Sequence, residues 1–543
     1  MKTLSQTLRS HVPGEHVVEI RPDRLSVGRR SHYGSERSSV LVIVLWITFG
    51  LVSLALYFAQ SANFEFRAAD NRVAALEAEQ AIEGGARYVS NVLAAVLLQT
   101  NLPPALPDTF SYQQQAVPVG EAMFWLIGRN TNNLQTGPIT PAFGLVDESG
   151  KLNLNTATLD MLQWLPRMTP DLAANIVSWR QSSTNTGTGS SSSSSSSGSS
   201  YGVTPDAYSQ LTAAYLCKSA PYETVDELRL VFGLTPDLLY GEDMNLNGIL
   251  DANENDGDVT PPSDDANGLL DPGLFEYVTV WSREPSTASD GSQRVNVTNI
   301  TDMTTLLQQK FNDSRAVQIL QSAGLSAATA GARGGGQGTG GASSGRGGTT
   351  TTGGGSTTGA GGSRGGGASG GTGGVVVAVT VPTFGSLLEF YLKSGMTEDE
   401  FAQIADNITT TNSTNVTGLV NINTASQAVL SCIPGIGSNT APAVVSYRLS
   451  NAANLTSVAW VANVLDSNSA IQAGPYITAR SYQFSADIAA VGHFGRGFRR
   501  VRFIFDISEG VPKIVYRQDL THLGWALGKE VRDKLLLANI NKR

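Results

Sequence analysis

The chain has 543 residues, which is enough for two or three domains. Its formal net charge is −9, so its overall charge does not indicate a nucleic-acid-binding protein. It contains two cysteines, Cys217 and Cys432, which are too few for a disulfide-built scaffold, although an exported chain could pair them.

An apolar run covers residues 40–59, VLVIVLWITFGLVSLALYFA, and contains no charged side chain. A helix of this length measures about 30 Å, the thickness of the hydrocarbon core of a bilayer. Because unpaired backbone groups are costly in lipid, we expect a transmembrane helix here. A buried core helix and a cleaved secretory signal are the alternatives, but the run is longer than the apolar part of most signals.

The charges beside this run predict its orientation. Five arginines lie between residues 21 and 37, whereas Asp and Glu dominate the segment that follows the run. The positive-inside rule then keeps residues 1–39 in the cytoplasm and exports the rest of the chain.

The helical pattern continues to Gln99, and no proline interrupts it before Pro103. The apolar positions at helical spacing are Ala68, Ala75, Leu76, Ile82, Ala86, Val89, Leu93 and Val96. This second half of the helix needs a surface to pack on, such as a sheet. Strands are predicted at residues 123–127, 143–146 and 275–282, and alternating sequence predicts three more at 482–488, 501–507 and 513–516.

The middle of the chain is predicted to be mostly helical and is interrupted by tracts of low complexity. Helical patterns cover residues 152–180, 204–217, 224–232, 295–323, 383–392 and 397–405. Residues 183–202 are rich in Ser and residues 331–374 are rich in Gly, Ser and Thr, so both tracts are predicted to be disordered.

Two nearly identical segments, LNLNTA at residues 152–157 and VNINTA at 420–425, each precede a helical pattern. Their Asn and Thr side chains are expected to cap the helix that follows. The second segment leads to Gly435-Ile436-Gly437, which resembles a helix-hairpin-helix turn whose backbone amides can hold a DNA phosphate. No basic residue follows that turn, so a compact packing unit is favoured over DNA binding.

Residues 243–254 fit the calcium-loop pattern D-x-[DN]-x-[DN]-G-x5-E at every fixed position. The expected ligands are the side chains of Asp243, Asn245 and Asn247, the carbonyl of Ile249, Asp251 directly or through water, and both oxygens of Glu254. A looser repeat of the pattern, Asp264, Asp265, Asn267 and Asp271, could add ligands or hold a second ion. The alternative for both stretches is an Asn/Asp/Gly turn without an ion.

No catalytic constellation is found in the sequence. The five histidines are not paired at metal-ligand spacing, and no G-x-S-x-G motif occurs. An enzyme is therefore not expected.

Together these parts resemble protein K, the large member of the minor pseudopilin family of type II secretion systems. The resemblance covers most of residues 30–520 and is strongest at 39–46, 150–157, 176–180, 222–230, 418–425 and 433–437. It implies a pilin-like subunit that binds calcium and caps the tip of the periplasmic pseudopilus. It also implies an inner-membrane location and, as partners, the other minor pseudopilins and the secretion platform of that membrane.

In this family a peptidase removes the leader after a Gly that precedes the apolar run. The equivalent position here is Ser38, with Ser39 next to it, and the nearest glycine is Gly34. Ordinary pilins carry Glu at the fifth mature position; cleavage after Ser38 would place Ile43 there, and cleavage after Gly34 would place Ser39. The resemblance to protein K implies that this Glu is absent.

The sequence thus predicts an α+β fold, with a long N-terminal helix on a small antiparallel sheet and a large inserted helical domain. The expected divisions are a leader at 1–39, a transmembrane helix at 40–60, a pilin-like part at 61–150, an inserted domain at 151–475 with its calcium loop at 241–273, and C-terminal strands and tail at 476–543. A membrane-anchored DNA receptor that uses helix-hairpin-helix units is the alternative function.

Overall fold

The computed structural model describes residues 36–98, 103–129, 141–181, 202–325 and 382–541. The chain forms two compact units, Met1–Asp70 and Asn71–Arg543, which we describe separately. Most of the leader and the low-complexity tracts predicted at 183–202 and 331–374 lie outside the described residues, apart from Gly202 and the start of the first helix.

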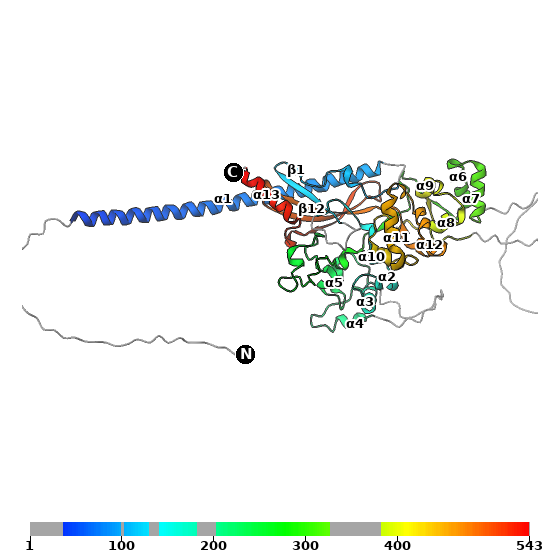
Figure 1. Ribbon diagram of the computed structural model, residues 1–543, viewed down its shortest axis with the longest axis horizontal. Helices are drawn as coiled ribbons and strands as arrows, with labels where there is room; N and C mark the ends of the chain where they lie inside the picture. Colours follow the sequence, from blue (N-terminus) through cyan, green and yellow to red (C-terminus); the bar gives the residue numbers. More distant parts are fainter. Residues whose placement is uncertain (1–35, 99–102, 130–140, 182–201, 326–381, 542–543) are drawn as a thin grey trace, which may run out of the picture. The chain divides into compact units, whose positions relative to one another are not determined.

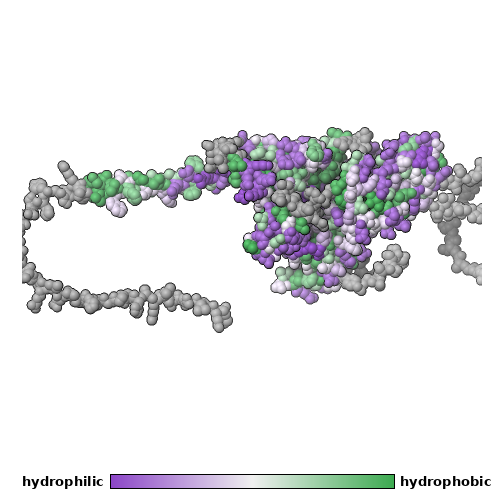
Figure 2. Space-filling view, in the orientation of Figure 1, coloured by the Kyte–Doolittle hydropathy of each residue, from purple (hydrophilic) through white to green (hydrophobic). Residues whose placement is uncertain are grey.

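The first helix, α1, runs from Glu36 to Leu97 without interruption, as the sequence predicts. Every side chain from Val40 to Gln60 is exposed, and Figure 2 shows this part of α1 as an apolar surface. By length and composition the helix can cross a membrane. An apolar helix that buries none of these side chains within its own chain fits a lipid environment better than water.

The second half of α1 buries a stripe of small residues on the sheet. The buried positions are Ala74, Ala78, Ala81, Ile82, Ala86, Val89 and Leu93. At Gly85 a Cβ atom would lie 3.1 Å from a methyl group of Ile488, so the small residues let helix and sheet approach closely. The prediction was wrong at Ala68 and Leu76, which are exposed. Ala68 precedes the first buried position, Ala74, and Leu76 lies off the buried side of the helix.

The sheet has six strands and is antiparallel throughout, which confirms the predicted α+β class. Its order is β1-β2-β12-β13-β14, and β3 pairs with the start of β12. The strands are β1 (Val117–Val119), β2 (Ala122–Ile127), β3 (Val146–Asp147), β12 (Gln483–Val491), β13 (Arg499–Asp506) and β14 (Lys513–Asp519). Figure 1 shows the second half of α1 running along this sheet.

The two faces of the sheet pack against different partners. One face and α1 share an apolar core that includes Phe124, Ile488 and Phe503. The other face has a smaller apolar cluster around Trp125 and Leu527, beside the C-terminal helix α13 (Gly528–Asn541). The sequence pattern predicts only strands and a tail in this last part, so α13 was not predicted.

The inserted domain leaves the sheet after β3 and returns to it at β12. Its helices are α2 (Leu159–Gln163), α3 (Pro170–Arg180), α4 (Pro205–Tyr208), α5 (Pro236–Tyr240), α6 (Ile300–Lys310), α7 (Asp313–Ser322), α8 (Leu387–Ser394), α9 (Glu398–Ile404), α10 (Gln427–Ser431), α11 (Gly437–Ser450) and α12 (Ser467–Ala473). Its strands are β4 (Leu152–Asn153), β5 (Val278–Thr279), β6 (Arg283–Pro285), β7 (Val295–Asn296), β8 (Ile408–Thr409), β9 (Asn415–Thr417), β10 (Val420–Asn421) and β11 (Ile477–Thr478).

Three predicted elements of this domain are shorter than expected. The helix predicted at 204–217 is only α4, the one at 224–232 is the 3₁₀ segment η3 (Val225–Leu230), and the strand at 275–282 is reduced to β5. Each stretch is a short connector whose conformation depends on its packing partners more than on its own periodicity.

A buried ionic network joins the inserted domain to the start of β12. The Glu284 carboxylate accepts hydrogen bonds from Arg480 and from Arg294, the latter at 2.8 Å. Arg294 also donates to Asp406 at 3.1 Å and to the Tyr482 hydroxyl at 2.7 Å. Burial alone would raise the pKa of Glu284, but the charges of Arg480 and Arg294 outweigh burial and hold that pKa below its usual value.

Replacing Gly497 by Ala should separate the β12–β13 turn from α1. Gly497 has φ +66°, and a Cβ atom there would lie 2.4 Å from the carbonyl carbon of Ala74. Gly510 is the matched control, because its φ is +79° and no atom lies within 4 Å of the Cβ position. Both changes carry the left-handed cost of about 1–2 kcal/mol. We expect Gly497→Ala to lose about 1–3 kcal/mol more, as overpacking does; equal losses in denaturant unfolding would contradict this close contact.

Replacing Glu284 by Gln should destabilise the protein near neutral pH, because it leaves two buried guanidinium groups without their shared carboxylate. The expected loss at pH 7 is about 3–5 kcal/mol. A carboxyl group whose pKa is lowered by folding stabilises the folded protein at pH values above its unfolded-state pKa. This stabilisation is lost as the pH falls through the folded-state pKa. Chemical unfolding should therefore show wild type and variant converging below about pH 4. The exposed control Glu509→Gln should change little, and a pH-independent gap for Glu284→Gln would argue against the ionic account.

Candidate functional site

The inserted domain contains two copies of one unit. The first copy runs through β4, α2, α3, η3, α5, the 3₁₀ turn η5 (Leu274–Glu276) and β5. The second runs through β10, α10, α11, the 3₁₀ segment η8 (Val458–Asn463), α12, the 3₁₀ turn η9 (Gly474–Tyr476) and β11. In each copy the first and last strands pair in parallel. The two N-x-N-T-A segments therefore open equivalent units.

The Asn residues of these segments do not cap the helices, contrary to the prediction. The Thr158 hydroxyl caps α2 and the Ser426 hydroxyl caps α10. Instead, the side-chain oxygen of Asn153 accepts the N–H two residues later at 2.8 Å, and Asn421 does the same at 2.9 Å. These bonds form tight turns that end the opening strands, because an Asn side chain can stand in for a backbone carbonyl.

In each copy, one arginine donates hydrogen bonds to backbone carbonyls of the N-x-N-T-A segment. Arg448 donates to the carbonyls of Ile422 and Ala425 at 3.0 and 2.6 Å, and Arg180 donates to the equivalent carbonyls in the first copy. Burial lowers the pKa of the Arg448 guanidinium to about 10. Both guanidinium groups are thus occupied by the backbone turns of their own copies.

The helix-hairpin-helix turn of the second copy does not offer a phosphate site. The amides of Ile436 and Gly437 donate to the carbonyl of Ile433 at 3.0 and 3.2 Å. A Cβ atom at Gly435 would lie 2.3 Å from the carbonyl oxygen of Ser469, so the turn packs tightly against α12. Residues 416–459 contain one charged side chain, the buried Arg448. Phosphate binding relies on accessible positive charge, so this hairpin is better suited to packing.

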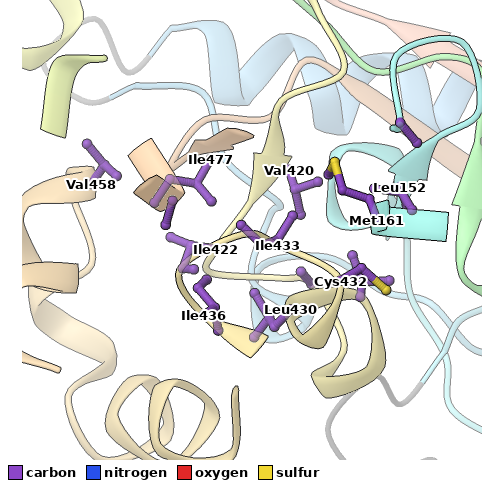
Figure 3. Close-up of a cluster of buried hydrophobic side chains, with 14 of the residues drawn as sticks. Leu152, Met161, Val420, Ile422, Leu430, Cys432, Ile433, Ile436, Val458 and Ile477 are labelled. Carbon is purple, nitrogen blue, oxygen red and sulfur yellow. The ribbon is translucent and has the colours of Figure 1, made fainter. Parts of the chain in front are cut away.

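The two copies share one apolar core. Figure 3 shows Leu152 and Met161 of the first copy beside Val420 and Cys432 of the second, and all four side chains belong to the same buried cluster. Both cysteines are free thiols: Cys432 contacts its own helix α10, and Cys217 lies beside the carbonyl of Trp179 at 3.8 Å. The two copies are therefore held together by apolar packing and not by a disulfide between these cysteines.

The loop predicted to bind calcium lies between α5 and η5 and folds around its own side chains. The Asp243 carboxylate accepts the amides of Asn247 and Gly248, both at 2.8 Å. The side-chain oxygen of Asn247 accepts the amide of Ile249 at 2.8 Å. Gly248 has φ +71°, the backbone conformation that a sharp turn at the sixth position requires.

The last ligand position of this loop carries a buried carboxyl group that lacks full pairing. Glu254 is 1% exposed; its Oε2 accepts the amide of Asp251 at 3.0 Å, and its Oε1 has no hydrogen-bond partner. Burial, and then the negative charge of Asp243, raise the pKa of Glu254 to about 9. The Nδ2 groups of Asn245 and Asn247 point at the Asp251 carboxylate at 2.7 and 2.9 Å. This oxygen-rich, under-paired loop fits the needs of a hard cation.

Carboxylates alone do not form a metal site here. Within the described part of the chain, no group of three or more His, Cys, Asp or Glu side chains is placed to hold a metal ion. A cation in the loop would therefore also need the amide oxygens of Asn245 and Asn247 and the carbonyl of Ile249, as the sequence pattern specifies.

The looser set of acidic residues makes other contacts. Asp264 accepts the backbone amides of Asp256 and Gly257, and Asp265 pairs with the side chain of Asn267 at 2.7 Å. Asp271 lies 3.4 Å from the Arg167 guanidinium. These residues order the outer part of the loop, and we place no second ion there. Ser38 and Ser39 lie in the first turns of α1, where side chains are not described, so cleavage beside them stays a prediction.

Comparisons with known proteins agree with parts of this description. Residues 416–459 match the family described as "Helix-hairpin-helix motif". One similar solved structure is the GspK-GspI-GspJ complex from the type 2 secretion system of enterotoxigenic Escherichia coli, with a TM-score of 0.35 and 9% identity over 81% of this chain and 96% of that chain. No curated protein sequence matches the chain. Because both similarity values are low, conclusions about function depend on the features of the chain itself.

Proposed function

We propose that this chain is a minor pseudopilin of a type II secretion system, anchored in the inner membrane by α1, with the remainder in the periplasm. It caps the tip of the pseudopilus and contacts the other minor pseudopilins. The observation that supports this most is the division of one uninterrupted helix into an exposed apolar half and a half that packs on an antiparallel sheet. A subunit of a membrane-anchored filament needs both halves.

The attachment point of the inserted domain favours the tip position. The turn between β12 and β13 approaches Ala74, near the start of the packed half of α1. The opposite end of β12 lies by the end of α1, where the amide of Ser481 donates to the carbonyl of Pro104 at 2.9 Å. The insertion leaves and re-enters the sheet at this second end. It therefore occupies the side on which another subunit would have to stack.

The apolar half of α1 also lacks the group that joins a pilin to its neighbour. In pilins the Glu at the fifth mature position meets the N-terminal amine of the next subunit. Residues 40–60 contain no charged side chain. Without such a Glu in this segment, the chain cannot make that contact. The contact matters in lipid because an unpaired ion there costs several kcal/mol.

Cryo-microscopy of pseudopili isolated from cells is the test of the tip position. A gold label placed in residues 331–374 of the full chain should appear once, at one end of each filament. The same label on the major subunit is the control and should mark the whole shaft. Labels of this chain at regular intervals along the shaft would refute the capping role.

We also propose that the loop at residues 241–273 binds one calcium ion through Asp243, Asn245, Asn247, Ile249, Asp251 and Glu254. The balance of charge beside the loop supports a divalent cation. Arg129 pairs with Glu276 and lies near Asp243, and Arg500 and Arg502 lie beside Asp487. Among the described residues, the buried Glu254 has only other carboxylates near it, Asp243, Asp251 and Glu242, and burial and these charges raise its pKa to about 9. A divalent cation would supply the missing positive charge, because a buried carboxylate is costly unless it is paired.

Calcium should therefore raise the thermal stability of the full chain in detergent. Loops of this kind in extracellular modules bind with dissociation constants of about 10⁻⁴ to 10⁻³ M. At about 100 times that constant the ion would add roughly 2.7 kcal/mol. Glu254→Gln should remove most of the gain and melt close to the wild type in chelator, because Gln resembles the protonated acid. The exposed control Asp265→Asn should keep the gain. A wild type that melts equally with calcium and with chelator would refute the site.

A further inference from the structure

Two guanidinium groups from the sheet meet on one carbonyl of the calcium loop. Arg129, which follows β2, donates to the carbonyl of Leu246 at 2.6 Å. Arg500, on β13, donates to the same carbonyl and to that of Asn245. Leu246 lies between Asn245 and Asn247, so these bonds fix the backbone from which both proposed amide ligands extend.

The contacted backbone is held in an unfavourable conformation. Leu246 has φ +54°, a region in which a side chain with a Cβ atom is strained. Such a conformation persists only where the surroundings hold it. Two charged donors on its carbonyl supply that restraint, because hydrogen bonds to ionised groups are stronger than neutral ones.

Both arginines are themselves fixed by carboxylates that are not proposed ligands. The Arg500 side chain is fully buried and makes two hydrogen bonds to Asp487, at 2.9 and 2.7 Å. Arg129 donates to Glu276 at 3.0 Å. Burial acts to lower the pKa of Arg129, but nearby carboxylates, chiefly Glu276 and Asp243, raise it above its usual value. Each guanidinium group is thus held by a carboxylate outside the proposed ligand set, Asp487 for Arg500 and Glu276 for Arg129.

We propose that Arg500 and Arg129 are positioning residues that set the calcium affinity of the loop from outside its ligand shell. This inference depends on the proposed calcium site. Their bonds hold the carbonyls of Asn245 and Leu246 towards the sheet. This fixes the backbone from which the side chains of Asn245 and Asn247 reach the Asp251 carboxylate, the third of the neighbouring proposed ligands. Changes to the partners of metal ligands typically lower metal affinity by about 10- to 100-fold.

Calcium titration of the full chain in detergent, by calorimetry, tests this role. Arg500→Lys keeps the positive charge, but an ammonium group cannot reproduce the fork that bridges Asp487 and two carbonyls. We expect its calcium affinity to fall at least about 10-fold. Arg502→Lys is the matched control: Arg502 lies two residues along the same strand and 3.6 Å from Asp487, and its described contacts include no hydrogen bond to the loop. It should bind calcium within about twofold of wild type.

Arg129→Lys is a second variant, which keeps the test valid if Arg500→Lys folds poorly. Circular dichroism should first show that each variant is folded at the titration temperature. Wild-type affinity in both Arg500→Lys and Arg129→Lys would overturn the inference while leaving the calcium site intact. A wild type that binds no calcium would overturn the site and the inference together. An equal loss in Arg502→Lys would also overturn the inference, because it would reflect general destabilisation or the net charge of the region.

Discussion

The position of the inserted domain on the sheet depends on buried polar bonds more than on apolar packing. The apolar side chains form separate clusters: one inside the inserted domain, one between α1 and the sheet, and one on the opposite face of the sheet. Most contacts that cross from the domain to the sheet are ionic or hydrogen-bonded, such as Arg283 to Asp506, Arg294 to Tyr482, and Asn421 to Asp147. Aromatic side chains add to them, as where the ring of Trp281 packs on that of Tyr516. Apolar surfaces can slide over each other, whereas directional bonds between buried charges specify one orientation.

This arrangement makes the junction sensitive to any charge left unpaired. Asp147 accepts hydrogen bonds from Ser481, Thr424, Asn421 and Ser149, yet burial still raises its pKa. In the loop at residues 241–273, burial likewise raises the pKa of Glu254, and one of its buried oxygens has no hydrogen-bond partner. A domain attached in this way can respond to a cation without any change in its apolar core.

Local signals allowed the main features to be predicted from the sequence. The apolar run needs only length and composition, and the C-terminal strands need only alternation. Calcium binding by residues 243–254 follows from spacing within twelve residues and stays a prediction. The contacts that give these elements their roles are distant in the chain. Arg500 is 254 residues from Leu246, and nothing in its local pattern marks it as more than one polar position on an alternating strand. The predicted Asn caps were wrong for a related reason. An Asn side chain can bond several nearby backbone groups, and Asn153 and Asn421 bond the amide two residues later instead of a helix amide.

The two chain connections of the inserted domain enter the sheet at one point. Asp147, at the end of β3, pairs with Phe484 near the start of β12, so both connections lie side by side. Because β3 and β12 are paired strands, the same short stretch of sheet holds both connections. Further bonds at the same place, such as Arg283 to Asp506, add to this attachment.

The loop at residues 241–273 contacts the sheet far from this attachment. Arg500 pairs with Ala489, five residues along β12 from Phe484, which corresponds to about 17 Å of strand. Two attachments this far apart restrict the orientation of the domain more than either does alone. In the second copy, α12 passes directly into η9, whereas the first copy has the loop between α5 and η5. The loop at residues 241–273 has no counterpart in the second copy. It is thus the part of the inserted domain that contacts the sheet at Arg500. Loosening it would change the orientation of the domain before it changed the folding of either core.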